Sequence, residues 1–287
     1  MAALQQNHLA KESELYIFSD AAKSPEDEQT IQSVRAFVNT IGGFKSIHIF
    51  EAKKNKGLGL SIISGVTQVL LEHDKVIVLE DDLRITPNFL LFMNSCLNAY
   101  QHEPKVFSVS GYSFDLGKDD KERYDAYFLN RGWSWGWATW KDRWEKVDWE
   151  VKDYALFIQD IDAQKEFSKG GSDLNKMLSK QMSGKLDSWA IRWFYHQFRS
   201  QGLTVYPVLS KVYNEGFDED ATHTIGSVKR YIPILDNLGK HTFMLPTQIV
   251  ESSFYQREFQ KKMGKFARLK SKLETILKTV SAYVQDT

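Results

Sequence analysis

The stretch KVIVLEDD, residues 75–82, joins a continuous apolar run to three carboxylates. A short run rich in β-branched residues is typical of a strand that is covered on both faces of a sheet. In an open parallel sheet, ligands bind beyond the carboxyl ends of the strands, which is where Glu80, Asp81 and Asp82 fall. Hard divalent cations such as Mg²⁺ and Mn²⁺ bind one or two carboxylates together with the phosphates of a ligand. The stretch therefore predicts a metal-nucleotide site, although the three acids alone also suit a turn that is merely solvated.

The segments before this stretch alternate between strand and helix patterns. Residues 15–18 and 46–50 are short apolar runs that predict strands. Helical spacing of apolar residues over 31–41 and 58–70 predicts a helix after each of them, and residues 24–27 form a capped, acidic helix start. Because three βα alternations in a row imply a parallel sheet, we expect an α/β, Rossmann-like fold, mostly parallel, with helices on both faces.

The pattern changes beyond Gly111. A predicted helix from Pro87 to about Tyr100 and a strand over 106–109 complete the nucleotide-binding half. Six tryptophans then fall within seventeen positions, at 133, 135, 137, 140, 144 and 149. Further along, we expect helices over 172–182 and 188–198 and a strand over 204–209.

Composition narrows the classes of partner and location. Lys plus Arg and Asp plus Glu both total 37, so the formal net charge of zero gives no global field that would recruit nucleic acid. Cys96 is the only cysteine, which excludes an internal disulfide and a cysteine-based zinc site. No apolar run reaches the ~20 residues of a spanning helix, and the first ten residues lack a signal-peptide core. We expect a cytoplasmic protein, with peripheral contact to the inner face of the membrane as an alternative.

Five segments in order resemble one enzyme family. Residues 78–83, followed by a helix that opens at 87–90, are similar to the metal-binding segment of the N-acetylglucosaminyltransferase I family and its bacterial relatives. These are transferases of the GT-A fold that use nucleotide-activated sugars. The other similar segments, which together with the first span about 200 residues, are Phe18-Ser19-Asp20, Gly136-Trp137 with Trp140, Leu186-Asp187-Ser188-Trp189, and Phe217 to His223.

The resemblance implies a role for each acid of these segments. Asp82 would coordinate the divalent metal, while Glu80 and Asp81 would face the sugar and ribose of the donor. Asp20 would hydrogen-bond the uracil. Asp187 would be the general base that deprotonates the acceptor hydroxyl, and it stands alone because Ser188 replaces the second acid of that family segment.

Three other residues are candidate donor contacts by the same resemblance or by position. His223 would lie near the diphosphate. Trp137, next to Gly136, is the tryptophan that we expect to meet ligand, and Arg131 could contact donor phosphate or acceptor.

Each of these residues also has a purely structural interpretation. Asp187 could be the N-cap of the following helix, and Asp20 could close a strand-to-helix turn. His223 could be solvated in a polar loop, and Arg131 could be solvated at the surface. The tryptophans as a group are expected mainly to fill the core.

The last forty residues have a pattern of their own. Met263, Phe266, Leu269, Leu273, Ile276 and Val280 recur at three- and four-residue steps, which predicts an amphipathic helix from Phe259 onward. Between Arg257 and Lys278, eight Lys and Arg against two Glu give a local charge of 8 − 2 = +6. This helix could lie on an anionic membrane or dock on its own domain or on a second protomer. We therefore divide the chain into a GT-A domain over residues 11–245 and a basic helical segment over 246–287.

The resemblance implies an inverting, metal-dependent glycosyltransferase with a UDP-sugar donor and a glycan or lipid-linked acceptor. The alternative is a non-catalytic subunit that keeps the fold and binds sugar or nucleotide. Transferases of this type begin with an apolar strand, whereas here only fourteen residues precede Leu15 and residues 4–9 have the pattern of a helix end. We expect that the first strand is missing, through a misassigned start or a truncation, and that this chain alone is weak or inactive.

Overall fold

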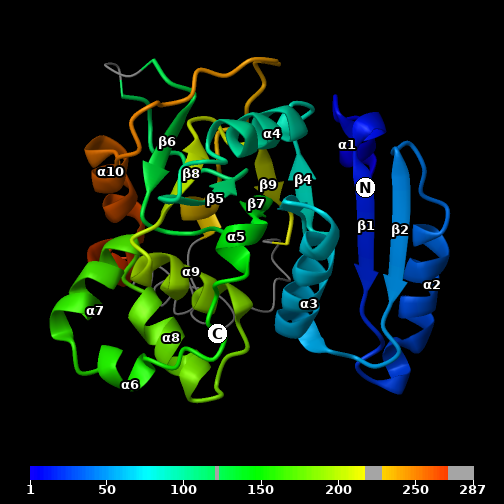
Figure 1. The fold of residues 1–287 in the computed structure, drawn as a ribbon, viewed down its shortest axis with the longest axis horizontal. Coiled ribbons are helices and arrows are strands. Elements are labelled where there is room, and N and C mark those ends of the chain that lie inside the picture. The colour runs from blue at the N-terminus through cyan, green and yellow to red at the C-terminus, as the bar shows by residue number, and fades with distance from the viewer. Residues whose placement is uncertain (120–122, 217–227, 271–287) are drawn as a thin grey trace, which may run out of the picture.

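The computed structural model describes residues 1–119, 123–216 and 228–270 as an α/β structure (Figure 1). Its first half alternates strands and helices closely as expected, with boundaries that differ by one to three residues. These elements are α1 (Ala2–Gln5), β1 (Glu14–Ser19), α2 (Glu28–Val38), β2 (Ser46–Glu51), α3 (Gly57–Glu72), β3 (Lys75–Val78), β4 (Leu83–Ile85), α4 (Phe89–Ala99) and β5 (Val106–Ser110). The capped helix start predicted over residues 24–27 is present, in the form of a capping box between Ser24 and Asp27.

β4 of the first half was not predicted from the sequence. The second half adds three more strands that the sequence did not reveal, β6, β7 and β9. Its elements are β6 (Ala126–Leu129), β7 (Trp137–Trp140), α5 (Lys141–Trp144), α6 (Tyr154–Phe157), α7 (Ile161–Phe167), α8 (Leu174–Met182), α9 (Trp189–Arg199), β8 (Leu203–Pro207), β9 (Val212–Asn214) and α10 (Ser253–Met263). Short 3-10 turns cover Ala10–Glu12, Pro25–Asp27, Ser168–Gly170 and Val228–Tyr231.

The main sheet is mixed, and the expectation of a mostly parallel sheet was wrong. Its strand order is β3-β7-β5-β8-β6, and of its four strand pairs three are antiparallel and only β5 with β8 is parallel. The physical reason is that β7, from the tryptophan-rich region, inserts between β3 and β5 and runs against both. The βα alternation of the first half is real, but within the described residues it produces a parallel pair only at β1 and β2.

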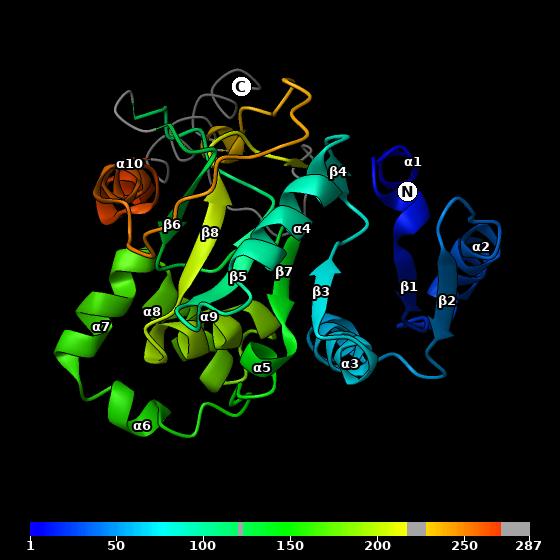
Figure 2. The ribbon, with the colours of Figure 1, turned by 45° about the horizontal axis from the view of Figure 1, so that its top comes forward.

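β1 and β2 form a two-stranded sheet of their own, and β4 pairs with β9 in another. Figure 2 shows the β1–β2 pair at one side of the molecule, with α3 between it and the main sheet. α3 packs against both β1 and β3. A Cβ at Gly65 of α3 would lie 3.2 Å from the ring of Phe18, so this glycine permits close contact between the helix and β1.

Helices cover both faces of the main sheet, as expected. Side chains alternate along β7, so that Trp137 enters one hydrophobic core while Ala138 and Trp140 enter the other. The core on the Ala138 face is built mainly with α4 and α10. The core on the Trp137 face is built with α3 and helices α5 to α9.

The C-terminal helix α10 docks on the core at the Ala138 face of the main sheet. Tyr255, Phe259 and Met263 are buried in it, and α10 packs against β6. The predicted amphipathic helix is interrupted at Gly264, beyond which Phe266 is 90% exposed. Leu273, Ile276 and Val280 lie outside the described residues. None of the helices within the described part of the chain is long and apolar enough to span a bilayer.

Candidate functional site

The acid cluster, Glu80, Asp81 and Asp82, lies directly after β3 as the sequence predicts. Asp81 is exposed, while Glu80 and Asp82 are half-buried. The backbone carbonyl of Asp82 accepts a hydrogen bond of 2.8 Å from the amide of Glu215, and β4 then pairs with β9 through Leu83 and Asn214. The cluster is therefore fixed against the segment from Asn214 to Gly216.

Gly216 allows this close approach. A Cβ at position 216 would lie 2.6 Å from Oδ2 of Asp82, which no side chain could tolerate without a shift. The side chain of Asn214 hydrogen-bonds the Asp82 carboxylate. The other oxygen, Oδ1 of Asp82, is buried and has no hydrogen-bond partner among the described residues. A buried carboxylate oxygen without a partner is costly and requires a reason.

The electrostatics of the cluster favour a bound cation. Burial, followed by the charges of Asp82 and Asp81, raises the pKa of Glu80 to about 7. Burial and the neighbouring Asp81 also raise the pKa of Asp82, against the opposing hydrogen bond from Asn214. Carboxylates that disfavour one another's ionised form in this way are stabilised by a cation between them.

The acid cluster suits a metal ion that is coordinated partly by the protein and partly by a bound ligand. It does not form a closed protein cage around an ion. Within the described residues, no three His, Cys, Asp or Glu side chains converge on one point that could hold an ion. Mg²⁺ and Mn²⁺ sites in phosphate-binding enzymes commonly use one or two carboxylates and take their remaining ligands from phosphate and water. The unpartnered oxygen of Asp82, together with Glu80, meets this smaller requirement.

Asp187 does not cap α9, which corrects one interpretation of this residue. Ser188 is the N-cap, and its hydroxyl accepts a hydrogen bond of 3.3 Å from the amide of Ile191. The side chain of Asp187 is 67% exposed. Its carboxylate is therefore not engaged in helix capping and is accessible to solvent.

The carboxylate of Asp187 lies against the first turn of α3. A Cβ at Gly59 would lie 2.7 Å from its Oδ1, and one at Gly57 would lie 3.8 Å from its Oδ2. The N-terminal end of a helix carries partial positive charge, which favours an anionic side chain at this position. Two glycines thus give Asp187 access to the helix end.

Arg192 joins Asp187 to the loop that contains Trp149. Its Nη2 lies 3.8 Å from Oδ1 of Asp187, and its Nη1 donates a 3.3 Å hydrogen bond to the carbonyl of Trp149. The guanidinium also lies over the Trp149 indole at 5.9 Å from the ring centroid. In the same loop, buried Val151 has a φ of 53°, a strained value for a β-branched residue. The loop beside Asp187 is thus held in a conformation that its own sequence disfavours.

Asp20 lies at the same end of α3 but is already fully engaged. Its carboxylate accepts hydrogen bonds from the amides of Lys56, Gly57 and Ala21 and from the hydroxyl of Ser61. Burial alone would raise the pKa of Asp20, but these hydrogen bonds outweigh it and hold the pKa below its ordinary value. The hydrogen bond from Ala21 agrees with the turn-closing interpretation, whereas those from Lys56, Gly57 and Ser61 attach Asp20 to the start of α3. Together they leave little hydrogen-bonding capacity for a base.

α3 connects these groups in space. The helix packs against β3 and α9, and only two residues separate its end at Glu72 from the start of β3 at Lys75. β3 therefore runs back along α3, and the chain leaves it toward the helix end where Asp20 and Asp187 lie. β3, which leads to the acid cluster, and α9, which follows Asp187, thus both pack against α3.

Trp137 and Arg131 face the interior instead of a ligand. Trp137 is 0% exposed and stacks on Trp189 with ring centroids 5.0 Å apart, so its side chain packs in the core. Arg131 is 4% exposed, and its guanidinium hydrogen-bonds both carboxylate oxygens of Asp173. It is thus neither solvated at the surface nor open to a donor phosphate in this structure.

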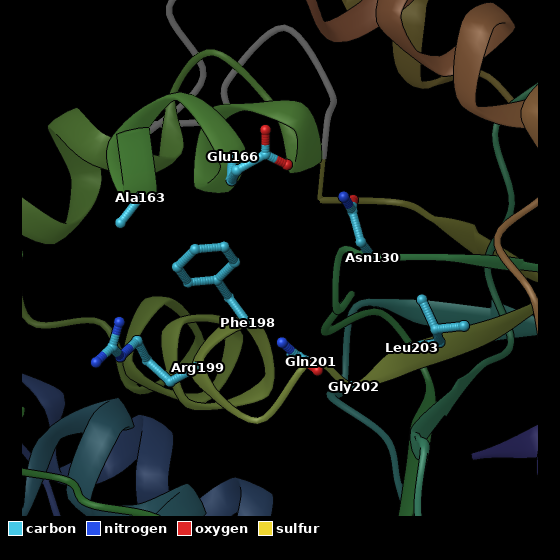
Figure 3. A pocket seen from close by; sticks show the side chains of 8 residues that line it. All are labelled: Asn130, Ala163, Glu166, Phe198, Arg199, Gln201, Gly202 and Leu203. Atoms are coloured by element: carbon cyan, nitrogen blue, oxygen red, sulfur yellow. The ribbon is translucent and has the colours of Figure 1, made fainter. Parts of the chain in front are cut away.

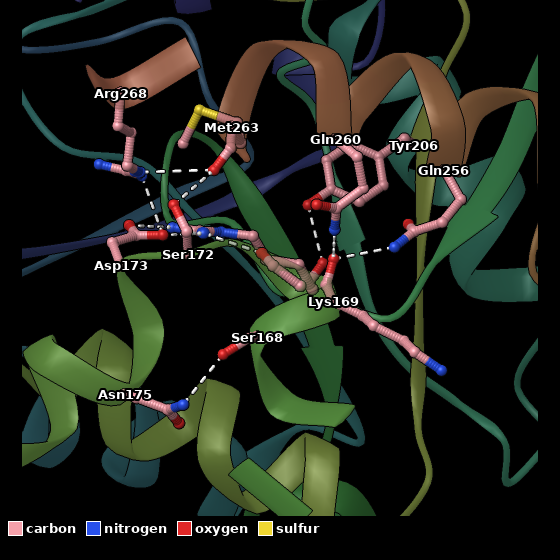
Figure 4. A network of polar contacts seen from close by, with 12 residues as sticks. Ser168, Lys169, Ser172, Asp173, Asn175, Tyr206, Gln256, Gln260, Met263 and Arg268 are labelled. Atoms are coloured by element: carbon pink, nitrogen blue, oxygen red, sulfur yellow. Dashed lines mark hydrogen bonds and ion pairs between the residues drawn. The ribbon is translucent and has the colours of Figure 1, made fainter. Parts of the chain in front are cut away.

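Asp173 is shared between two arginines (Figure 4). Arg268, beyond α10, lies 2.9 Å from the same carboxylate. Burial alone would raise the pKa of Asp173, but the two guanidinium groups hold it below its ordinary value. This network attaches the C-terminal segment to α8. His223, the remaining predicted contact, lies outside the described residues.

Sequence reasoning missed three residues at these sites: Gly59, Arg192 and Asn214. Gly57 and Gly59 alternate at a predicted helix start, which signals close approach of another group to the helix end. Arg192 follows Asp187 by five positions, close to one helical turn after the N-cap. Asn214 carries no local signal, since its contact with Asp82 depends on the pairing of β4 with β9.

Comparison with known proteins adds no relative: no protein-family model and no curated protein matches this chain.

Proposed function

We propose that this chain is a metal-dependent glycosyltransferase of the GT-A type. It would move a sugar from a nucleotide-diphospho-sugar, specifically a UDP-sugar, to a hydroxyl of a glycan or lipid-linked acceptor with inversion at the anomeric carbon. The support is a half-buried carboxylate cluster after a strand, together with an accessible carboxylate at the N-terminal end of the neighbouring helix.

The observation that carries the proposal is the buried, unpartnered Oδ1 of Asp82 within the acid cluster. An oxygen in this position is stabilised by a divalent cation more readily than by a neutral donor, because Glu80 and Asp81 add negative charge beside it. Asp82 and Glu80 would hold the cation, which when bound would neutralise the charge that develops on the diphosphate leaving group.

Asp187 would act on the acceptor. As the acceptor oxygen forms its bond to the anomeric carbon, its proton passes to the carboxylate of Asp187, and the bond from that carbon to the diphosphate breaks with its electron pair leaving on UDP. Arg192 and the first turn of α3 would hold the Asp187 carboxylate in place. Since Asp187 is not a helix cap, its orientation depends on these two neighbours.

The metal site is tested with Asp82→Asn and a matched control, Asp74→Asn. Asp74 is exposed and lies just before β3, at the other end of the same strand. Calorimetry of UDP with Mn²⁺ should show binding to the parent and to the control and none to Asp82→Asn, with melting temperatures that stay close together. Equal Mn²⁺-dependent affinity in Asp82→Asn would refute the metal site.

The catalytic step is tested with UDP release from a panel of UDP-sugars in the presence of Mn²⁺. Asp187→Asn should keep donor affinity and lose turnover by about two to four orders of magnitude, the usual contribution of a general base. A parent protein that binds UDP but releases none from any donor would instead indicate the non-catalytic binding subunit.

A further inference from the structure

The chain beyond α10 presents two apolar side chains to solvent. α10 ends at Met263, the backbone is extended at Gly264, and residues 265–270 are helical again. Phe266 is 90% exposed and Leu269 is 57% exposed, in contrast to the buried face of α10 itself. We name residues 265–270 the Phe266 segment. Its apolar side chains belong to neither hydrophobic core of the described chain.

The side chains of the Phe266 segment differ in exposure between its two faces. Successive helical side chains are roughly 100° apart, because a turn contains about 3.6 residues. The four exposed side chains therefore share an arc of roughly 140°, in the order Lys265, Leu269, Phe266 and Lys270. The other two, Ala267 and Arg268, fall on the opposite side of the helix and are half-buried. The exposed face is thus an apolar stripe with one lysine along each border.

The opposite face is fixed to the protein by Arg268. Its Nη2 lies 2.9 Å from Oδ1 of Asp173, and its Nε donates a 3.4 Å hydrogen bond to the carbonyl of Met263 (Figure 4). Asp173 is held in turn by the buried Arg131. The Phe266 segment is therefore attached to the chain on one side, and its apolar stripe faces away from it.

The charge around the segment favours an anionic partner. Residues 257–270 contain six Lys and Arg and one Glu, a net charge of 6 − 1 = +5. Three of these cations pair with an acid. The three that have no ion pair within the described part of the chain are Arg257, Lys265 and Lys270, and all three are exposed. Two of them border the apolar stripe, so the stripe lies in a positive potential that attracts a negatively charged surface.

α7 extends the exposed apolar surface beside the segment. Ile161 of α7 is 66% exposed, and it lines a shallow hollow together with Lys165 and Lys265. The other side of α7, which carries Ala163 and Glu166, faces a separate hollow against the end of α9 (Figure 3). Ile161 and the border of the apolar stripe are therefore neighbours on one surface.

We propose that the Phe266 segment binds the surface of an anionic lipid bilayer. Phe266 and Leu269 would enter the boundary between headgroups and acyl chains, while Lys265 and Lys270 would reach lipid phosphates on either side of them. An apolar stripe bordered by lysines suits this boundary better than a protein partner, because lysine is depleted in protein–protein interfaces. This inference does not depend on the proposed transferase function.

The test is flotation of the full chain with two kinds of vesicle, one of phosphatidylcholine alone and one of equal parts phosphatidylcholine and phosphatidylglycerol. One double variant, Phe266→Ser with Leu269→Ser, removes the apolar stripe. The other, Lys265→Gln with Lys270→Gln, removes the bordering charges. Phe37→Ser is the matched control, since Phe37 is a 58% exposed phenylalanine on α2, on the opposite side of the molecule from α10 (Figure 1).

We expect the parent and the control to float with the anionic vesicles and far less with the neutral ones. Binding should weaken about fivefold for each lysine removed and about tenfold or more without the apolar stripe. Salt at about 1 M should reduce the difference between the two kinds of vesicle. Melting temperatures should stay close together, because all the substituted side chains are exposed.

Three results would overturn the proposal. The parent could fail to float with the anionic vesicles, it could float equally with the neutral ones, or either double variant could float as well as the parent. A parent that binds no vesicle but forms a dimer, which Phe266→Ser with Leu269→Ser disrupts, would assign the stripe to an interface between copies of the chain instead.

Discussion

Gly59→Ala is expected to separate catalysis from stability, because Gly59 lies where α3 meets the candidate base. The added Cβ would lie 2.7 Å from Oδ1 of Asp187, whereas an ordinary contact begins at 3.4 Å. The carboxylate must therefore move by about 3.4 − 2.7 = 0.7 Å. Since the Asp187 side chain is 67% exposed, it can move toward solvent without disturbing the core.

The two expected effects have opposite signs. Alanine stabilises a helix relative to glycine by up to about 1 kcal/mol, so the free energy of unfolding should stay equal or rise. A misplacement of about 1 Å at a reacting group can cost on the order of a hundredfold in rate, so a shift of this size should lower turnover about tenfold or more. Donor affinity should not change, because the added methyl group meets the carboxylate of Asp187 and not the acid cluster.

The measurements are urea unfolding, UDP calorimetry and UDP release with Mn²⁺, with Gln68→Ala as the control in the same helix. Gln68 is exposed and lies more than two turns along α3 from Gly59. It should leave turnover unchanged. If Gly59→Ala binds donor, unfolds normally and turns over at the parental rate, then Asp187 does not act from the position described. A double variant with Asp187→Asn should show no loss beyond that of Asp187→Asn alone.

Three further predictions concern stability. In chelator, the protein should lose stability as pH rises from about 4.5 to about 7, because a carboxyl whose folded pKa is raised favours folding only while it is protonated; Glu80→Gln should flatten this part of a melting-temperature profile. Gln201→Gly should raise the free energy of unfolding by roughly 1 kcal/mol in urea, since Gln201 occupies the left-handed position at the end of α9 where glycine is unstrained, and a loss of stability would contradict this. Asp236→Ala should cost about 3–5 kcal/mol because it leaves the buried ammonium of Lys211 without its partner, and adding Lys211→Met should recover part of the loss; a cost under about 1 kcal/mol would show that water reaches the pair.

The first half of the fold was predictable because its signals are local. Apolar spacing and the capped helix start at residues 24–27 determine β1 to β3 and α4 within a few residues. The order of strands was not predictable, since β7 reaches its place between β3 and β5 through contacts distant in sequence. The sequence predicts mainly core packing for the tryptophans and a ligand contact for Trp137, and only the sheet determines that Trp137 faces the packed core.

The charged residues of the candidate site could be predicted from the sequence, but their hydrogen-bond partners and contacts could not. A carboxylate cluster after an apolar strand is visible from the sequence, and so is an acid before α9. The strand was expected to be covered on both faces, whereas β3 is a half-buried edge strand. The shift of the N-cap by one residue, from Asp187 to Ser188, frees the carboxylate, yet both residues cap helices well and the sequence does not rank them. The engagement of Asp20 depends on amides thirty-six and thirty-seven positions away, which no local pattern reveals.

α3 is the element on which the geometry of the whole site depends. β1 and β2 share no ladder with β3 within the described residues, so the position of Asp20 relative to the acid cluster is not fixed by a common sheet. It is fixed by the first turn of α3, whose amides Asp20 binds, and by the contact of Phe18 with Gly65. A two-stranded sheet is marginally stable alone and thus relies on this helix. Because β3 follows α3 after two residues and Asp187 lies against its first turn, a displacement of α3 would move the groups proposed for donor and acceptor chemistry together.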